Sequence, residues 1–447
     1  MDAPASPAAL ARPTWGRAGW AVVVGAFLVG FAQGPLAAVG WRFDHLPGIH
    51  IDGRFNLYVL EHGYRWTRGE VASFWDLPIY HPAPRVTAYS DAHLGSLPLY
   101  AGLRAAGLSP EAAYQVWFLL PFLLNYVAAA WAARRLNGGP VAAATAGYVF
   151  AFAVTALQHT VGHSQLGPRF LVPPAVLLAH HWLTTPDVRR LSLLAACLVV
   201  QAYLTIYLAY YLGLLVLATW VATALLNQRA VSWPTLARGW WKWLLVGVVM
   251  VASLVPLVRP YLRAGHDHMQ ADPRWLEVYT PTPEVWLLAP DLGVHAHWMH
   301  AVFPTLAGHP GLPELHLFPG WLPLLGLIAA AALAVRRCDP PAVLAVAALL
   351  VVLVTTRVGG FCLYDPVFRL PGGGSIRVVA RIVLVLLFPA GLGLGFLLDE
   401  LARGRRTVGV LLVGLVVADQ LVRPWGDVWD THRTPVAGVN DATSRLV

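Results

Sequence analysis

Long apolar runs recur along the whole chain and are separated by shorter polar segments. Eleven of these runs are long enough to cross a bilayer, whose hydrocarbon core needs about 20 apolar residues in helical form. They lie near residues 18–39, 112–133, 140–158, 167–184, 190–206, 208–226, 243–260, 320–336, 341–357, 378–400 and 407–422. The pattern predicts an all-α integral membrane protein with about eleven transmembrane helices.

The composition supports this class. Of the 447 residues, 57% are hydrophobic and 12% are charged, whereas an average soluble domain has roughly 25% charged residues. Soluble, collagen-like and disordered chains are therefore excluded. The formal net charge is +8, but Lys242 is the only lysine, and we draw no inference of nucleic-acid binding from this arginine-rich composition.

The positive residues between the runs predict the orientation. With the N-terminus in the cytoplasm, every short loop that carries arginine or lysine falls on the cytoplasmic side. These loops contain Arg134-Arg135, Arg189-Arg190, Arg229 with Arg238 and Lys242, Arg336-Arg337, and Arg403 with Arg405-Arg406. This assignment requires residues 91–107 to form a helix on the outer surface instead of a span. We therefore predict a multi-pass protein of the cytoplasmic (inner) membrane.

The polar chemistry gathers on the other side. The outer segments are a large first loop at 40–111 that carries surface-lying helices, a turn at 159–168, and loops at 261–319 and 358–377. We divide the chain into a catalytic membrane module, 1–260, and a second part, 261–447, which holds the two later outer loops and the last transmembrane helices. Any reaction is expected on the outer face.

Acidic residues of the first outer loop are the main catalytic candidates. Asp52 opens a predicted helix that ends at Glu61 and His62, and Asp91 opens the next helix. Carboxylates at a membrane boundary suit a general base, or the binding of a divalent metal such as Mg²⁺ or Mn²⁺. Helix capping explains Asp52 and Asp91 equally well. Glu61 is a further catalytic candidate and His62 a substrate-binding candidate.

The turn between the third and fourth runs reads LQHTVGHSQLGPRF. His159 and His163 are four residues apart and share a face if the turn is helical, and Gln165 and Arg169 follow. These residues suit hydrogen bonds to a substrate or pyrophosphate. No third metal ligand has matching spacing, so metal binding is less favoured, and a packed polar turn is the alternative.

Arginines mark the outer ends of two runs. Arg259 and Arg263 form one i, i+4 pair, and Arg377 and Arg381 form another. A guanidinium group binds phosphate oxygens with two hydrogen bonds, so Arg263, Arg377 and Arg381 are candidates for binding a lipid phosphate. Contact with ordinary phospholipids explains Arg259 at least as well.

Some common sites are not indicated. The tract HAHWMH at 295–300 has neither the spacing of a zinc finger nor that of a helical metal motif. Glu277, Asp291 and Asp365 are the other outer-loop acids that merit testing. The sequence has no P-loop and no dinucleotide-binding glycine motif.

Taken together, these features resemble the GT-C superfamily of integral-membrane glycosyltransferases. The similarity is one of layout and covers most of the chain: an N-terminal span, the segment DGRFN that begins at Asp52, the EHGY that begins at Glu61, the HxxxHxQ turn, and a late outer loop that ends in arginine. The chain departs from the oligosaccharyltransferase branch, because it has no WWDYG-like motif and no large C-terminal soluble domain. Peptide acceptors are therefore in doubt.

The resemblance implies a specific activity. GT-C enzymes move a sugar from a polyprenyl-phosphate or polyprenyl-pyrophosphate carrier to an acceptor on the outer face of the membrane. Asp52 would be the first-loop base or metal ligand, Asp91 a second polar or metal-binding group, and Arg377 and Arg381 would stabilise the leaving phosphate. A single displacement would invert the anomeric carbon. The acceptor is a glycan, a lipid or a protein.

Two other functions compete. A transporter or lipid-carrier flippase normally places ionisable groups near the bilayer midplane, whereas the polar residues within these runs are chiefly Asn125 and Gln201. A non-catalytic envelope assembly protein would tolerate loss of the outer-loop acids.

Overall fold

The computed structural model describes residues 15–48, 52–268, 274–302, 304, 314–369, 376–423 and 433–437, with the side chains of 265–268 left aside. Helices dominate these residues. The longer ones are α1 (Arg17–Gln33), α5 (Pro110–Arg135), α6 (Pro140–Phe152), α8 (Val172–Thr184), α9 (Val188–Leu204), α10 (Ile206–Leu226), α12 (Trp240–His268), α15 (Trp321–Arg337), α16 (Pro340–Thr355), α18 (Val383–Leu401) and α19 (Arg406–Asp419). Every predicted apolar run coincides with one of them.

Shorter elements connect and extend these helices. They are α2 (Pro35–Val39), α3 (Asp52–Thr67), η1 (Val86–Tyr89), α4 (Leu97–Ala105), α7 (Val154–Gly162), η2 (Ser164–Leu166), α11 (Trp233–Arg238), α13 (Arg274–Tyr279), η3 (Pro283–Leu287), α14 (Ala296–Val302), α17 (Asp365–Phe368) and η7 (Val379–Ile382). Strand β1 (His45–Pro47) pairs antiparallel with β2 (Arg433–Pro435), with Leu46 opposite Thr434.

Six helical segments are long and apolar enough to cross a membrane. They are Arg17–Val39, Pro110–Arg135, Pro140–Gly162, Ile206–Leu226, Trp240–Ala264 and Val379–Leu401. The expected count of eleven is not confirmed, because the other five predicted runs form helices of 13 to 17 residues. Helix α8 illustrates the reason: hydrogen bonds to the Asn125 and Gln201 side chains hold residues 167–169 outside the helix. The helix begins only at Val172, and its 13 residues span about 20 Å.

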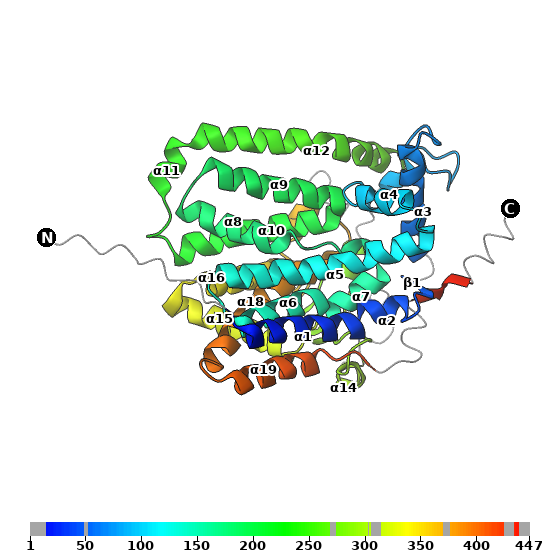
Figure 1. Cartoon of the computed structure of the whole chain (residues 1–447). Coiled ribbons are helices and arrows are strands. Elements are labelled where there is room, and N and C mark those ends of the chain that lie inside the picture. The colour runs from blue at the N-terminus through cyan, green and yellow to red at the C-terminus, as the bar shows by residue number, and fades with distance from the viewer. Residues whose placement is uncertain are drawn as a thin grey trace.

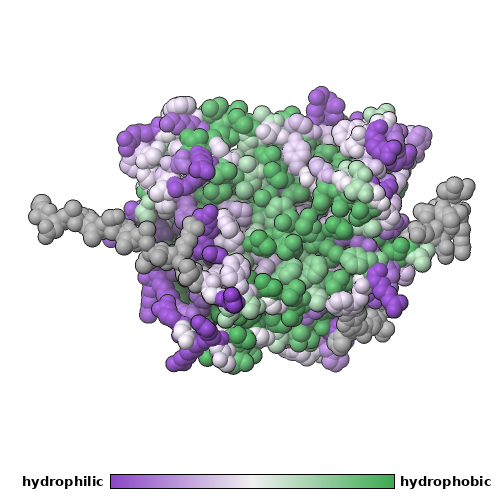
Figure 2. Space-filling model, in the orientation of Figure 1, coloured by the Kyte–Doolittle hydropathy of each residue, from purple (hydrophilic) through white to green (hydrophobic). Residues whose placement is uncertain are grey.

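The long helices run side by side, and the polar residues gather at the two ends of the bundle (Figures 1 and 2). A broad apolar surface lies between these ends, as expected for a multi-pass membrane protein. Helix α12 lies at the edge of the bundle, and only 6% of its apolar window is buried, against 94% for the Pro140–Gly162 segment. The outer face of α12 is therefore a surface for lipid.

The centre of the bundle is helix α6, which packs against α1, α5 and α18. Small residues allow these helices to approach closely. Gly395 of α18 faces the α6 backbone, and a Cβ atom there would lie 2.7 Å from the carbonyl oxygen of Ala142. Helices from both parts of the chain thus share one core.

This contact predicts the result of a stability measurement. Gly395→Ala is expected to destabilise the protein by about 1–3 kcal/mol, because the added methyl group overpacks the contact with Ala142. Gly414→Ala in α19 is the control: its Cβ meets no atom within 4 Å, and alanine is the better helix former. Unfolding midpoints in detergent test this, and equal midpoints for the two variants would contradict the packing described.

One end of the bundle carries most of the non-spanning structure. Figure 1 places α3, α4 and β1 at this end and α11 and the start of α1 at the other. We call the first the α3 end and the second the α11 end. Because consecutive helices alternate in direction, the arginine-bearing turn after α5 and the α11 connection lie away from α3. Which end faces the cytoplasm remains the prediction made from charge.

The first outer loop differs from the expectation in detail. Helix α3 does not end at Glu61 and His62 but continues to Thr67. Asp91 does not open a helix, since α4 begins at Leu97; its carboxylate Oδ1 instead accepts a hydrogen bond of 2.8 Å from the backbone N–H of Ile206, the first residue of α10. The nine residues of α4 extend about 14 Å, too short for a span.

Candidate functional site

A histidine joins two carboxylates at the α3 end. His163 Nδ1 lies 2.7 Å from Asp52 Oδ2, and its Nε2 lies 2.6 Å from Glu314 Oε1. The three residues come from the first outer loop, the turn after α7 and the second outer loop. The fold therefore brings together groups that are more than 100 residues apart in sequence.

Arg381 completes this group. Its Nε donates to Glu314 Oε2 at 3.0 Å and its Nη2 donates to Glu314 Oε1, and the guanidinium lies over the Tyr207 ring at 5.2 Å. His159 Nδ1 lies 3.4 Å from Glu314 Oε2. We call Asp52, His163, Glu314 and Arg381 the Asp52 network. It contains two carboxylates, one guanidinium and one imidazole.

The local backbone explains why Asp52 stands here. Gly48 has a φ of +115°, and a Cβ atom on it would lie 2.5 Å from Gly53 Cα. Glycine meets both demands, since it adopts positive φ freely and has no side chain. The close approach of Gly48 and Gly53 fixes the start of α3, and Asp52 is its first residue.

The His159–His163 turn is set by a break in a long helix. Ala153 adopts φ −52° and ψ 138°, which ends α6 and starts α7. The Gln420 side chain accepts the Val154 N–H at 3.1 Å, so the break keeps its hydrogen bond. His163 is the C-cap of α7, and its N–H bonds to the His159 carbonyl. Both imidazoles consequently reach Glu314.

Electrostatics favour the charged form of all three titrating groups. Burial alone would raise the pKa of Asp52, but the hydrogen bond and charge of His163 lower it. Burial also opposes the charge on Glu314, yet Arg381 and His163 hold its pKa well below the usual value. For His163, burial and Arg381 act to lower the pKa, while Glu314 and Asp52 outweigh them and raise it. At neutral pH both carboxylates are ionised, as a proton acceptor must be.

The raised pKa of His163 predicts a pH dependence of stability. Its ordinary value is 6.5, so its contribution to folding is fully present below pH 6.5 and is lost as the pH rises through the folded-state pKa. We expect the stability difference between wild type and His163→Gln to shrink over that interval. Melting temperatures of the two proteins from pH 5.5 to about 9 test this; a constant difference would contradict a protonated His163.

Asp91 lies beside the network but does not contact it directly. Burial raises the pKa of Asp91 to about 6, against the opposing effects of the Ile206 N–H and the Arg381 charge. Next to it, His93 Nε2 lies 3.0 Å from Asn56 Oδ1, and Asn56 donates to Gln165 Oε1 at 2.8 Å. Gln165 is thus held on the same side of α3 as His163.

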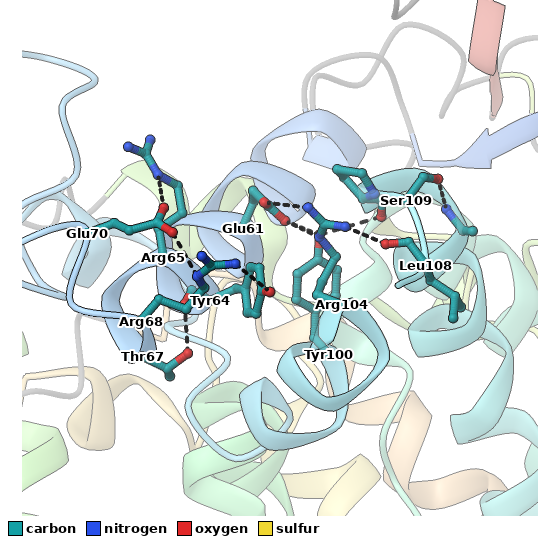
Figure 3. A network of polar contacts seen from close by, with 12 residues as sticks. Glu61, Tyr64, Arg65, Thr67, Arg68, Glu70, Tyr100, Arg104, Leu108 and Ser109 are labelled. Atoms are coloured by element: carbon teal, nitrogen blue, oxygen red, sulfur yellow. Dashed lines mark hydrogen bonds and ion pairs between the residues drawn. The ribbon is translucent and has the colours of Figure 1, made fainter. Parts of the chain in front are cut away.

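Glu61 and His62 lie further along α3. Glu61 is nine residues beyond Asp52, about 13 Å along the helix. Its carboxylate accepts two hydrogen bonds from Arg104, at 2.9 and 3.1 Å, and one from Tyr100, at 2.8 Å (Figure 3). His62 Nε2 lies 3.0 Å from the Ser73 carbonyl oxygen. Glu61 thus fastens α3 to α4, and His62 fastens α3 to the loop that follows α3.

The remaining arginine candidates occupy three different environments. Arg169 is fully buried, donates to the Phe150 carbonyl at 3.1 Å, and lies over the Phe150 ring. Arg377 is exposed and its guanidinium lies 5.8 Å from the centre of the Trp275 ring. Arg263 lies on the outer face of α12.

Arg263 borders an apolar groove. The groove has a volume of about 600 Å³ and is lined by α12 residues from Val251 to Arg263, including Arg259. Tyr261 of the same helix donates to the Ser90 carbonyl at 2.8 Å and accepts from the Ala92 N–H at 2.9 Å. Tyr261, which does not line the groove, thus fastens α12 to the segment that holds Asp91.

Glu314 is the functional candidate that the sequence analysis missed. It stands in the stretch PELHLFPGW shortly before α15, an isolated acid in apolar surroundings. Asp52 lies at a similar short distance after the first span. An acidic residue next to the end of a span was therefore the sequence signal that could have identified Glu314. A metal site is indicated elsewhere. Among the described residues, the three whose ligand atoms lie close enough together to hold an ion are Asp291, His300 and His316, which are outside the Asp52 network.

Comparisons with known proteins give a partial likeness in structure. No family model matches the chain, and no curated protein matches it. Among solved structures, the archaeal oligosaccharyltransferase AglB from Archaeoglobus fulgidus, in complex with an inhibitory peptide and a dolichol-phosphate, aligns with a TM-score of 0.44 and 13% identity. The alignment covers 89% of this chain and 54% of that one, so the chain spans about half the length of the structure it matches.

Proposed function

We propose that the protein is a membrane glycosyltransferase that moves a sugar from a polyprenyl-phosphate-type lipid to an acceptor at the outer face of the cytoplasmic membrane. The observation that carries the proposal is the Asp52 network at the α3 end of an apolar bundle. An ionised, partly exposed carboxylate is paired there with an imidazole and lies near the charge of Arg381, and α12 carries a lipid-facing groove. A proton acceptor, a phosphate site and a lipid site are the three requirements of such a transfer.

In the proposed reaction, Asp52 accepts the proton of the acceptor hydroxyl as the hydroxyl oxygen attacks the anomeric carbon. The bond from that carbon to the phosphate oxygen breaks, and its electron pair leaves with the phosphate. His163 is a positioning residue, since it hydrogen-bonds Asp52 Oδ2 and leaves Oδ1 for the acceptor. One displacement of this kind inverts the anomeric centre.

The two late arginines take different parts. Arg381 is 7% exposed and is held by Glu314, so it orients Glu314 and contributes positive charge. Arg377 is exposed, and its charge acts on Tyr207, the residue under Arg381. Arg377 is therefore the better placed of the two to bind the donor phosphate directly.

The groove on α12 provides the lipid contact in this proposal. Its apolar wall suits the polyprenyl chain, and Arg259 and Arg263 stand at its polar end. Tyr261 of the same helix hydrogen-bonds to Ser90, next to Asp91. Asp91 in turn accepts a hydrogen bond from the start of α10, and Tyr207 of α10 lies under the Arg381 guanidinium. These contacts tie α12, the helix that carries the groove, to the elements around the network.

The donor class can be tested directly. Purified protein in nanodiscs is incubated with radiolabelled sugars carried on polyprenyl phosphate, on polyprenyl pyrophosphate or on a nucleotide, together with a membrane extract as acceptor. The proposal predicts transfer from a lipid-linked donor and none from nucleotide sugars. Transfer from nucleotide sugars alone would overturn it, and movement of the intact lipid across the bilayer without sugar transfer would favour the flippase alternative.

Arg377→Ala tests the phosphate contact. Loss of a hydrogen bond between charged groups costs about 1.5–3 kcal/mol, so we expect the KM for the lipid donor to rise roughly tenfold or more, with a smaller change in kcat. Arg369→Ala is the matched control, because Arg369 is also exposed and follows α17 in the same late loop. Equal KM values for the two variants would remove Arg377 from the donor site.

A further inference from the structure

Two histidines face one carboxylate in the second outer loop. His300 Nδ1 lies 3.7 Å from Asp291 Oδ1, and His316 Nδ1 lies 3.7 Å from Asp291 Oδ2. The imidazole rings are stacked, with centres 5.2 Å apart and planes 17° apart. One ligand atom from each of the three residues lies within 4.8 Å of the others.

Hydrogen bonds determine which ring nitrogens carry protons. His300 Nε2 lies 2.8 Å from the Ala289 carbonyl oxygen, which only accepts, so Nε2 carries a proton and, in the neutral imidazole, Nδ1 keeps its lone pair. This arrangement is the usual one for a metal-binding histidine, whose second nitrogen donates to a carbonyl or carboxylate.

His316 has the same tautomer for a different reason. The Gln158 Oε1 atom accepts the Leu292 N–H at 3.1 Å, which leaves its NH₂ group facing His316 Nδ1 at 2.6 Å. Nδ1 must therefore be the acceptor, and Nε2 carries the proton. The neutral His300 Nδ1 and the Asp291 carboxylate are consequently two acceptors that face each other with no proton between them, while the lone pair of His316 Nδ1 accepts a hydrogen bond from Gln158. Such a set of acceptors repels itself unless a cation lies among them.

We propose that Asp291, His300 and His316 bind a zinc ion. Two imidazoles favour Zn²⁺ over Mg²⁺ or Ca²⁺, which prefer oxygen ligands. Zinc bonds of about 2.0–2.1 Å in tetrahedral geometry place neighbouring ligand atoms about 3.3 Å apart. The three ligand atoms lie within 4.8 Å of one another, so the ion must draw them together by at most about 1.5 Å. The Gln158 amide is the group that shifts when the ion enters.

The site is open on one side. The side chain of Asp291 is 48% exposed and that of His300 is 33% exposed, whereas that of His316 is 1% exposed. Solvent can therefore supply the ion and fill a fourth coordination position with water. The ion would tie His316 to α14 and to the loop of Asp291.

The zinc site adjoins the Asp52 network but is distinct from it. His316 is two residues beyond Glu314, and Gln158 precedes His159. The ion would fix the segment that presents Glu314 to His163 and Arg381, which makes it a positioning element and not a participant in the chemistry. This inference concerns metal binding alone and does not depend on the proposed transferase activity.

Metal analysis of the purified protein tests the site. The full chain, purified through a tag without histidine, is loaded with ZnCl₂, dialysed, and analysed for zinc by mass spectrometry. About one zinc per chain is expected for the wild type and for His297→Ala, a variant in the same helix whose histidine is exposed and lies outside the cluster. Asp291→Asn and His300→Ala are expected to retain less than a tenth of that amount.

Two results would overturn the proposal: a wild type that holds no zinc after loading, or cluster variants that hold as much as the wild type. Asp291→Asn keeps the shape of a partly exposed side chain, so of the cluster variants it should disturb folding least. A monodisperse peak in size-exclusion chromatography verifies that this variant is folded. Replacement of zinc by Co²⁺ adds a second readout. The intense visible absorption of a four-coordinate Co²⁺ site is expected in the wild type and in His297→Ala, and its presence in Asp291→Asn would also contradict the assignment.

Discussion

Asp52→Asn is expected to lower the rate of sugar transfer by about 10²- to 10⁴-fold, the range that a general base contributes. The amide has nearly the same shape as the carboxylate but cannot accept a proton from a hydroxyl group at neutral pH. Because Asp52 is partly exposed at the start of α3 and Gly48 and Gly53 fix the backbone there, the fold should survive the change.

The kinetic pattern separates a base from a binding residue. Loss of the base lowers kcat and kcat/KM together, with little change in the KM for the donor. Asp44→Asn is the matched control, since Asp44 precedes α3, is exposed, and has His45 as its side-chain partner. Wild-type turnover by Asp52→Asn would remove Asp52 as the base; equal losses in both variants would point to a general effect on the first outer loop.

Glu314→Gln is expected to affect both stability and activity. Glu314 is 9% exposed and pairs with Arg381 and His163, so its neutral analogue leaves a buried guanidinium without a countercharge. Breaking a buried ion pair on one side costs about 3–5 kcal/mol. We expect a corresponding loss of unfolding free energy, and activity that falls even at temperatures where the variant is folded.

A double variant distinguishes charge from packing in this prediction. In Glu314→Gln with Arg381→Met, no uncompensated guanidinium remains, so part of the lost stability should return. Glu400→Gln is the surface control, because Glu400 pairs with Arg337 while both side chains are more than 40% exposed, and exposed pairs contribute little. Additive losses in the double variant would show that Glu314 and Arg381 do not stabilise one another.

The sequence predicted the bundle well because apolar runs are a direct signal of helices in a membrane. Each predicted run forms a helix, but several helices are shorter than the predicted spans. Hydrophobicity alone does not show at which residue a helix begins or ends. The late start of α8 at Val172, the break at Ala153 and the extension of α3 to Thr67 all depend on local backbone geometry. The predicted number of membrane spans consequently differs most from the structure.

The candidate site was accessible to sequence analysis only in part. Asp52 was chosen as a base or metal ligand, His159 and His163 as groups that hydrogen-bond the substrate, and Arg381 as a phosphate-binding group. Their partner Glu314 was missed, because no spacing links a residue in the second outer loop to one in the first. Asp91, a catalytic candidate for which helix capping was the alternative, does not open its own helix and instead accepts a hydrogen bond from the first residue of α10, 115 residues away. Long-range partners of this kind are decided by the fold.

The central claim is that the Asp52 network is the reaction centre of a lipid-dependent sugar transfer. Its most direct test is a cryo-EM structure of the protein in nanodiscs with a non-hydrolysable polyprenyl phosphonate analogue of the sugar donor. The account predicts the sugar beside Asp52, the phosphonate within hydrogen-bonding distance of Arg377, and the lipid chain along α12 between Val251 and Arg263. An analogue bound at the α11 end, or one whose sugar lies away from Asp52, would contradict it.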